Sequence, residues 1–278
     1  MKLIIDAGST KMEWVLINGK EVMARFTTEG FNPNYSDSDR LTEMLTHQLP
    51  VVVPTEMQTI YYYGTGCGAE KNRVIVADTF RQHFVGAEIH VTHDLMAAAH
   101  AVLGNEKGIA CILGTGANSC VYDGGQIVEK AVSLGYMVGD EGSGCYIGRQ
   151  IVKSYFYGFM PENLRERFNE KYQLKVDDFV NQLYHNGQPN RYLASFAPFA
   201  SENLDDPFIS NLVRQCFDEY IKAFICRYDG YQSMKVSFVG SVAFHFMDIL
   251  KSCLEAHGIT MGEVLQNPMD GLVKYHTL

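Results

Sequence analysis

The chain has 278 residues, of which 46% are hydrophobic, and a formal net charge of −9 at pH 7. This length suits one large domain or two modest ones, and the acidic balance argues against a broad nucleic-acid surface, which needs a basic face. No apolar run approaches the ~20 residues that span a bilayer, and Asp6 soon interrupts the N-terminal apolar run, so we expect no membrane partner and no signal peptide.

The first hundred residues predict a meander of strands followed by alternating helices and strands. Strands are expected at 2–6, 12–17 and 21–27. Asn18 and Gly19 are a strong signal for a two-residue hairpin between the last two of these strands. A helix at 36–49 follows, with Ser36 or Ser38 as its expected N-cap. The elements expected after it are a strand at 58–63, a helix at 72–84, a strand at 88–92 and a helix at 94–103.

The opening pattern returns after a glycine-containing linker at 104–108. The recurrence predicts a structural duplication, and the alternation of strands and helices predicts an α/β fold. We therefore expect an N-terminal domain at 1–103, completed by a C-terminal helix near 260–278, and a second domain at 104–259. The other expected elements are strands at 109–113, 118–122, 126–132 and 235–239, and helices at 143–157, 161–171, 177–185, 207–228 and 242–257.

The turn after the first strand carries residue types that bind phosphate. A tight turn offers backbone N–H groups and hydroxyls to an anion. Asp6 at the end of the strand can hold Mg²⁺ through water, and Lys11 can reach a phosphate. The alternative is an ordinary hairpin turn with solvated polar residues. The phosphate-binding candidates of this first loop are Gly8, Ser9, Thr10 and Lys11.

A second glycine turn occupies the equivalent place in the repeated unit. It is not a dinucleotide-binding fingerprint, because the third glycine is absent, and it lacks the Gly-Lys-Ser/Thr of a Walker loop. Two such turns in a duplicated unit suit a polyphosphate, since they can face each other across a cleft. The phosphate-binding candidates of this second loop are Gly114, Thr115, Gly116 and Asn118.

Three further segments place functional candidates at helix starts. Asp94, between a strand and a helix, is either a helix N-cap or a general base that accepts a hydroxyl proton. Asp140 and Glu141 lie in a glycine-rich loop that either caps a helix or binds sugar hydroxyls. Gly240 follows a strand and permits the backbone to approach a flat ring, although many strand–helix junctions look similar.

In this order, the segments resemble the actin-like ATPase superfamily of sugar kinases, Hsp70 and actin over nearly the whole chain. The chain looks most like the BadF/BadG/BcrA/BcrD-type ATPases, and within them the N-acetylglucosamine kinase-like proteins. Residues 114–118 and 139–143 are the most specific matches. The resemblance implies a duplicated ribonuclease H-like fold, two domains around a central cleft, and the use of ATP and Mg²⁺.

The resemblance also assigns roles to individual residues. It implies that Asp94 is the catalytic base, that Asp6 lies on the metal side, and that Gly240 and Ser241 form the adenosine-side turn. At 132–135 this chain has Val-Ser-Leu-Gly where eukaryotic-type N-acetylglucosamine kinases have Gly-Gly-Trp-Gly, which implies a different wall of the sugar pocket. The implied sugar-contacting residues are Asn34, with Asn32 as the alternative, Gly135, Asp140 and Gly144.

These assignments predict a cytoplasmic, ATP-dependent kinase of a hexose or amino sugar, N-acetylglucosamine or a close relative, and a homodimer is one assembly to consider. A second hypothesis is an ATP-driven activator of a radical dehydratase, which would hold an iron–sulfur cluster on paired cysteines. Cys67 has no matching second cysteine, and the seven cysteines form no Cys-x-x-Cys pair, which predicts reduced thiols. A third hypothesis is a non-catalytic nucleotide- or sugar-binding protein.

Overall fold

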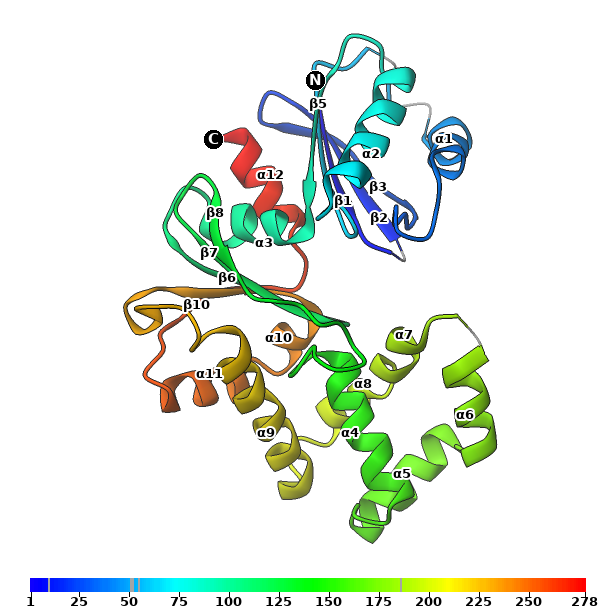
Figure 1. Cartoon of the computed structure of the whole chain (residues 1–278), viewed down its shortest axis with the longest axis vertical. Helices are drawn as coiled ribbons and strands as arrows, with labels where there is room; N and C mark the ends of the chain where they lie inside the picture. Colours follow the sequence, from blue (N-terminus) through cyan, green and yellow to red (C-terminus); the bar gives the residue numbers. More distant parts are fainter. Residues whose placement is uncertain (10, 51–52, 55, 186) are drawn as a thin grey trace. The chain divides into compact units, whose positions relative to one another are not determined.

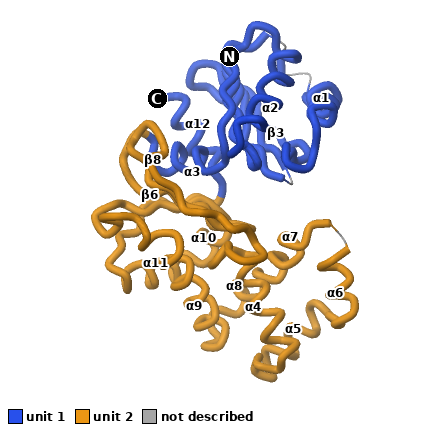
Figure 2. Tube along the Cα trace, in the orientation of Figure 1, with its two compact units in different colours: residues 1–104, 267–278 blue, residues 105–266 orange. Residues whose placement is uncertain are grey.

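The computed structural model describes all residues except 10, 51–52, 55 and 186. The described chain forms two compact units (Figure 1, Figure 2). Unit 1 comprises Met1–Gly104 and Asn267–Leu278, and unit 2 comprises Asn105–Gln266. The C-terminal segment is therefore part of the same unit as the N-terminus.

Unit 1 is built on a five-stranded mixed sheet. Its strands are β1 (Lys2–Ala7), β2 (Lys11–Asn18), β3 (Glu21–Glu29), β4 (Thr59–Gly64) and β5 (Glu88–His93). Their order is β3-β2-β1-β4-β5, with an antiparallel meander of β1, β2 and β3 and parallel additions of β4 and β5. Because side chains alternate along a strand, Leu3 and Ile5 enter the apolar core with α1 (Ser38–His47) and α2 (Glu70–His83), whereas Asp6 lies on the other face.

The opposite face of this sheet contacts α3 (Asp94–Leu103) and α12 (Met269–Thr277), which lie side by side (Figure 1). α12 is fastened to the sheet by Arg25 of β3, whose guanidinium pairs with Glu13 at 2.5 Å and with Asp270 at 2.6 Å. Asp6 and the start of α3 therefore share one face of the sheet.

Unit 2 repeats the same sheet topology. Its strands are β6 (Gly108–Leu113), β7 (Ala117–Tyr122), β8 (Ile127–Lys130), β9 (Val236–Val239) and β10 (Met261–Leu265). They pair in the order β10-β9-β6-β7-β8, with β6, β7 and β8 antiparallel and β9 and β10 parallel to β6. This order is that of unit 1, so the predicted duplication and the α/β class are confirmed. The C-terminal helix expected near 260–278 begins only at Met269, because the preceding residues form β10.

The helices of unit 2 share an apolar core with its sheet, in which Ile147, Phe217 and Leu250 pack with Phe238 of β9. The helix expected at 242–257 is interrupted at Phe246, and α7 and α8 were not predicted. None of the helices in the described part of the chain has the length and apolar character needed to cross a membrane. The helices are α4 (Gly144–Phe156), α5 (Glu162–Tyr172), α6 (Val176–His185), α7 (Pro189–Ala194), α8 (Ala197–Glu202), α9 (Pro207–Phe224), α10 (Ser241–His245) and α11 (Met247–Ala256).

Candidate functional site

The first loop is a tight turn between β1 and β2. The Gly8 N–H donates to the Lys11 carbonyl at 3.0 Å, and the Gly8 carbonyl accepts from the Phe31 N–H at 3.2 Å. Ser9 and Lys11 are exposed, so their polar groups are available to a ligand. Thr10, the remaining predicted phosphate-binding residue of this loop, lies outside the described residues.

Three carboxylates interact electrostatically on the α3 face of the unit 1 sheet. Asp6 of β1 lies directly opposite Glu13 of β2 in the strand register. The pKa of Asp6 is raised to about 7 by burial first and then by the negative charges of Asp94 and Glu13, while the positive charge of Lys11 opposes the shift. The Asp6 carboxylate therefore favours a nearby cation, since a positive charge would relieve its repulsion by Asp94 and Glu13.

Asp94 stands where β5 runs directly into α3. The N-cap of α3 is His93, not Asp94, because the His93 backbone is extended while Asp94 is already helical. Asp94 Oδ1 instead accepts the N–H of Leu95 at 2.9 Å. Burial raises the pKa of the Asp94 carboxyl, and hydrogen bonds from backbone N–H groups oppose that shift. The carboxylate is partly exposed, so it is accessible to a substrate and has an affinity for protons above that of an ordinary aspartate.

The two predicted sugar-contacting asparagines belong to a network of side-chain amides. Asn32 Nδ2 donates to Ser9 Oγ at 3.0 Å, and Asn32 Oδ1 accepts the Asn34 N–H at 3.0 Å. Asn72 of α2 donates to Asn34 Oδ1 at 2.8 Å and to the Gly66 carbonyl at 2.7 Å. The network joins the first loop to the loop after β4. Sequence reasoning missed Asn72, whose amide is 2% exposed; a polar residue on the buried side of the first helical turn was the available signal.

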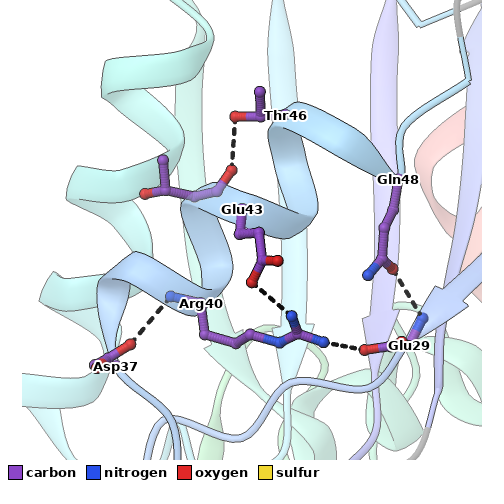
Figure 3. A network of polar contacts seen from close by, with 7 residues as sticks. Glu29, Asp37, Arg40, Glu43, Thr46 and Gln48 are labelled. Atoms are coloured by element: carbon purple, nitrogen blue, oxygen red, sulfur yellow. Dashed lines mark hydrogen bonds and ion pairs between the residues drawn. The ribbon is translucent and has the colours of Figure 1, made fainter.

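The segment that carries Asn32 and Asn34 is held at both ends by α1 (Figure 3). At the α1 end, Asp37 Oδ1 accepts the Arg40 N–H at 3.0 Å, so Asp37 is the N-cap and the expectation of Ser36 or Ser38 was wrong.

At the β3 end, the Arg40 guanidinium pairs with Glu29 and, at 2.6 Å, with Glu43 (Figure 3). Gln48 Oε1 accepts the Glu29 N–H at 3.3 Å. α1 is thus bonded to the last residue of β3 and to its own N-cap, which limits the freedom of the connecting segment between them.

The second loop, between β6 and β7, is hydrogen-bonded to the start of α4. The Gly114 N–H donates to the Gly116 carbonyl at 3.0 Å and closes the turn. The Gly144 N–H donates to the Gly114 carbonyl at 2.8 Å, and the Cys145 N–H donates to the Thr115 carbonyl at 3.1 Å. Gly144, predicted to contact the sugar, therefore uses its N–H to hold this loop.

Asp140 lies beneath the second loop in a left-handed backbone conformation, with φ of 57° and 8% exposure. A Cβ built on Gly116 would lie 3.1 Å from Asp140 Oδ2. Burial raises the pKa of Asp140, and a hydrogen bond from the Ala117 N–H lowers it. Because a left-handed non-glycine residue is strained, this geometry points to a positioned carboxylate. Capping of α4 falls instead to Ser143, whose Oγ accepts the Tyr146 N–H at 3.1 Å.

Gly135 and Asn118 both precede Asp140 in the chain. The Gly135 carbonyl accepts the Gly139 N–H at 2.8 Å, which bends the segment before Asp140. Asn118, in β7, accepts the Ser119 N–H on its own Oδ1 at 2.9 Å and the Tyr220 hydroxyl on its carbonyl at 3.3 Å. Asn118 is therefore positioned by contacts within unit 2.

A cavity of about 140 Å³ adjoins the second loop within unit 2. Gly240, at the turn from β9 to α10, has a φ of +135°, and a Cβ there would overlap the Leu113 carbonyl oxygen. The close approach that glycine permits lets Ser241 line the cavity together with the second loop. The walls include Gly114, Thr115, Gly144, Ala197, Ser241 and His245.

Comparisons with known proteins identify the fold. No protein-family model matches the chain, and no curated protein sequence does. The structure of a proposed N-acetylglucosamine kinase from Porphyromonas gingivalis matches at 38% identity and a TM-score of 0.94, covering 100% of this chain and 99% of that one. A proposed N-acetylglucosamine kinase from Chromobacterium violaceum matches at 17% identity and a TM-score of 0.75, over 99% of this chain and 98% of that one. A ROK hexokinase from Thermus thermophilus shares the fold at 15% identity and a TM-score of 0.52, over 98% and 96%.

The duplicated sheets are those of the actin-like ATPase fold, and the 38% identity to the Porphyromonas gingivalis protein makes the chain a kinase of this superfamily. At 38% identity over its whole length, the chain belongs to the same family as the Porphyromonas gingivalis protein, the N-acetylglucosamine kinase-like sugar kinases.

Proposed function

We propose that this protein uses ATP to phosphorylate a hydroxyl of a hexose or amino sugar, N-acetylglucosamine or a close relative, with Asp94 as the general base. The observation that carries the proposal is the Asp94 carboxylate: it is partly exposed, its pKa is raised, and it interacts with Asp6 beside the first loop. A base in phosphoryl transfer needs this combination of access and increased proton affinity.

In the proposed reaction, the sugar hydroxyl oxygen attacks the γ-phosphorus of ATP. The new O–P bond forms as the bond to the β-γ bridging oxygen breaks, ADP leaves, and the hydroxyl proton passes to the Asp94 carboxylate. Lys11 neutralises phosphate charge, and we assign hydrogen bonds to the phosphates to Gly8, Ser9 and Thr10.

In unit 2, we assign phosphate contacts to Gly114, Thr115, Gly116 and Asn118, and adenosine contacts to the turn at Gly240 and Ser241. The cavity beside Thr115 and Ser241 supports this assignment. For the sugar, we assign the amides of Asn32 and Asn34, the Asp140 carboxylate, and the backbone at Gly135 and Gly144.

The carboxylates of Asp6, Glu13 and Asp94 in unit 1 fit a magnesium ion that keeps its water shell. The described residues contain no cluster of three or more His, Cys, Asp or Glu side chains that could coordinate a metal directly. Mg²⁺ usually retains several waters, and the repulsion of Asp6 by Glu13 and Asp94 is the electrostatic setting that a hydrated cation would relieve. Asp6 would hold the ion through water, and the ion would supply charge neutralisation at the phosphates.

The decisive experiment is sugar-dependent ADP release by Asp94→Asn. We expect a loss of roughly 10²–10⁴-fold in kcat with ATP binding retained, because the amide keeps the shape of the side chain but accepts no proton. Asp78→Asn is the matched control, since Asp78 is an exposed residue of α2 that pairs with Arg81. Full sugar-dependent activity in Asp94→Asn would exclude Asp94 as the base.

A sugar screen in the same assay separates the proposed function from its two competitors. Stimulation by N-acetylglucosamine above glucose and N-acetylmannosamine supports the assigned substrate, while calorimetric binding without product would indicate a sensor. An activator of a radical dehydratase would need thiolates on an iron–sulfur cluster. Cys67 is fully buried, and burial raises its pKa to about 12, which disfavours that role.

A further inference from the structure

A cysteine, a histidine and an aspartate form a line in unit 2, outside the residues assigned to the kinase reaction. Cys226 follows the C-terminus of α9, and its Sγ lies 3.9 Å from Nδ1 of His257 at the end of α11. The other ring nitrogen, Nε2, lies 2.5 Å from Asp218 Oδ1 on α9. One imidazole therefore joins a thiol to a carboxylate.

The other groups that face the sulfur are polar or cationic. The Tyr231 hydroxyl hydrogen-bonds to Cys226, and the positive charge of Lys222 interacts with it. Lys222 Nζ also lies 2.5 Å from Asp218 Oδ2. These contacts come from α9, α11 and the turn before β9, and they would stabilise a negative charge on sulfur.

Cys226 differs from the other cysteines of the chain in its access to solvent. It is partly exposed, whereas the remaining six are buried. Burial raises the pKa of each of those six thiols, which keeps them protonated and unreactive. The six are Cys67, Cys111, Cys120, Cys145, Cys216 and Cys253.

The thiol, the imidazole and the carboxylate follow one another in the order that activates a thiol. His257 Nδ1 can take the thiol proton, and Asp218 holds the ring by accepting the Nε2 proton and stabilises the imidazolium that forms. A purely structural role, in which the contacts only fasten the end of α9 to the end of α11, would require no change in the reactivity of the sulfur.

We propose that Cys226 is a modification site for small hydroperoxides, with His257 and Asp218 as positioning residues that receive the thiol proton when the sulfur reacts. The thiolate attacks one peroxide oxygen, an S–O bond forms and the O–O bond breaks. Sulfur loses two electrons and becomes a sulfenic acid, while the peroxide is reduced. The leaving hydroxide or alkoxide takes the proton from the His257 imidazolium and departs as water or an alcohol.

The test treats the full-length protein with hydrogen peroxide, traps sulfenic acid with dimedone, and measures labelling of each cysteine by peptide mass spectrometry. We expect Cys226 to be labelled first, because it is more exposed than the other cysteines and His257 Nδ1 is placed to take its proton. In His257→Gln we expect a roughly tenfold slower reaction near pH 6.5 and a rate that climbs with pH as an ordinary thiol ionises.

Three variants complete the design. Cys226→Ser abolishes the label, Asp218→Asn slows it less than His257→Gln does, and His185→Gln, at an exposed histidine of α6, leaves it unchanged. Labelling of Cys111 reports unfolding, since that residue is fully buried in the native protein. The proposal is overturned if Cys226 reacts no faster than N-acetylcysteine, or if folded His257→Gln reacts like the wild type.

Discussion

The two units share one strand order but differ in what surrounds the glycine turn. In unit 1 the turn adjoins Asp6, Glu13 and Lys11, and the negative charges of Asp94 and Glu13 raise the affinity of Asp6 for protons. In unit 2 the turn adjoins one buried carboxylate, Asp140, and a cavity whose described lining contains no Asp, Glu, Lys or Arg. A duplicated frame has thus been specialised, with ionisable chemistry on one copy and a neutral pocket on the other.

The two copies also hold their turns by different means. Unit 1 adds side-chain amides to the backbone hydrogen bonds of Gly8: Asn32 donates to Ser9, and Asn72 is buried behind Asn34. Unit 2 uses backbone hydrogen bonds from the start of α4 to Gly114 and Thr115. Charge repulsion costs stability, whereas backbone hydrogen bonds supply it, so we expect substitutions in unit 1 to separate activity from stability and those in unit 2 to change both together.

The largest separation of activity from stability is expected for the substitution Asp6→Asn. The folded pKa of Asp6, about 7, lies above its ordinary value of 3.8, so the native state binds the extra proton between these values. The stability contributed by this group is complete below about pH 4 and is lost as the pH rises to about 7. We therefore expect the variant to melt several degrees higher than the wild type near pH 8 in a chelating buffer, with no gain near pH 4, while sugar-dependent turnover falls at least ~100-fold.

Thermal melts at the two pH values and ADP-release assays check this expectation. Asp39→Asn, at an exposed position in the first turn of α1, is the control and should change neither quantity. Equal melting temperatures of Asp6→Asn and wild type near pH 8 would show that the repulsion around Asp6 carries no cost.

Strands with regular alternation and clear turns were predictable from the sequence, and both meanders were placed within about two residues. The missed elements lack those signals. β10 is short, contains Gly262 and lies at the edge of its sheet. Its apolar and polar residues therefore need not alternate along the sequence. α7 follows Gly187 and begins at Pro189, a pairing that is also typical of turns. Its place against α4 depends on Gly148, where a Cβ would overlap the Leu193 carbonyl oxygen.

The candidate site was predictable as separate turns but not as contacts. Spacing placed Asp94 at a strand–helix junction. It could not show that His93 occupies the cap, since backbone angles decide which of the two residues is the N-cap. The Asn72 amide was invisible because its partners, Asn34 and the Gly66 carbonyl, come together only in the folded chain. Contacts between residues distant in sequence depend on tertiary packing, which local patterns do not report.

A moderate effect on both activity and stability is expected from Gly240→Ala in unit 2. Its φ of +135° is accessible mainly to glycine, and the added methyl would overlap the Leu113 carbonyl oxygen of the neighbouring strand. We expect a loss of about 2–4 kcal/mol in unfolding free energy and at least tenfold weaker ATP binding by calorimetry. Gly114→Ala is the matched stability control, because no heavy atom lies within 4 Å of the Cβ it would add. Equal melting of both variants would contradict the assigned strain.

The smallest expected effect is a loss of stability in acid at one contact of unit 1. Tyr63 Oη lies 2.8 Å from His100 Nδ1 of α3 and 2.8 Å from His276 Nε2 of α12. Burial lowers the pKa of His100 to about 4, and burial with nearby positive charge lowers that of His276 to about 3. Because both values lie below the ordinary 6.5, the unfolded state binds more protons, so this stability is present above about pH 6.5 and is lost as the pH falls toward 3.

We expect the two imidazoles together to lower the free energy of unfolding by on the order of 1 kcal/mol between about pH 7 and pH 6. In hydrogen exchange corrected for intrinsic rates, α3 and α12 should lose protection over this interval while β6 and β9 of unit 2 keep theirs. His276→Gln should flatten the pH dependence, and His47→Gln, at an exposed histidine of α1, should not. Equal loss of protection in both units would mean that acid acts on the whole fold, and the difference between the two copies would then not extend to their response to protons.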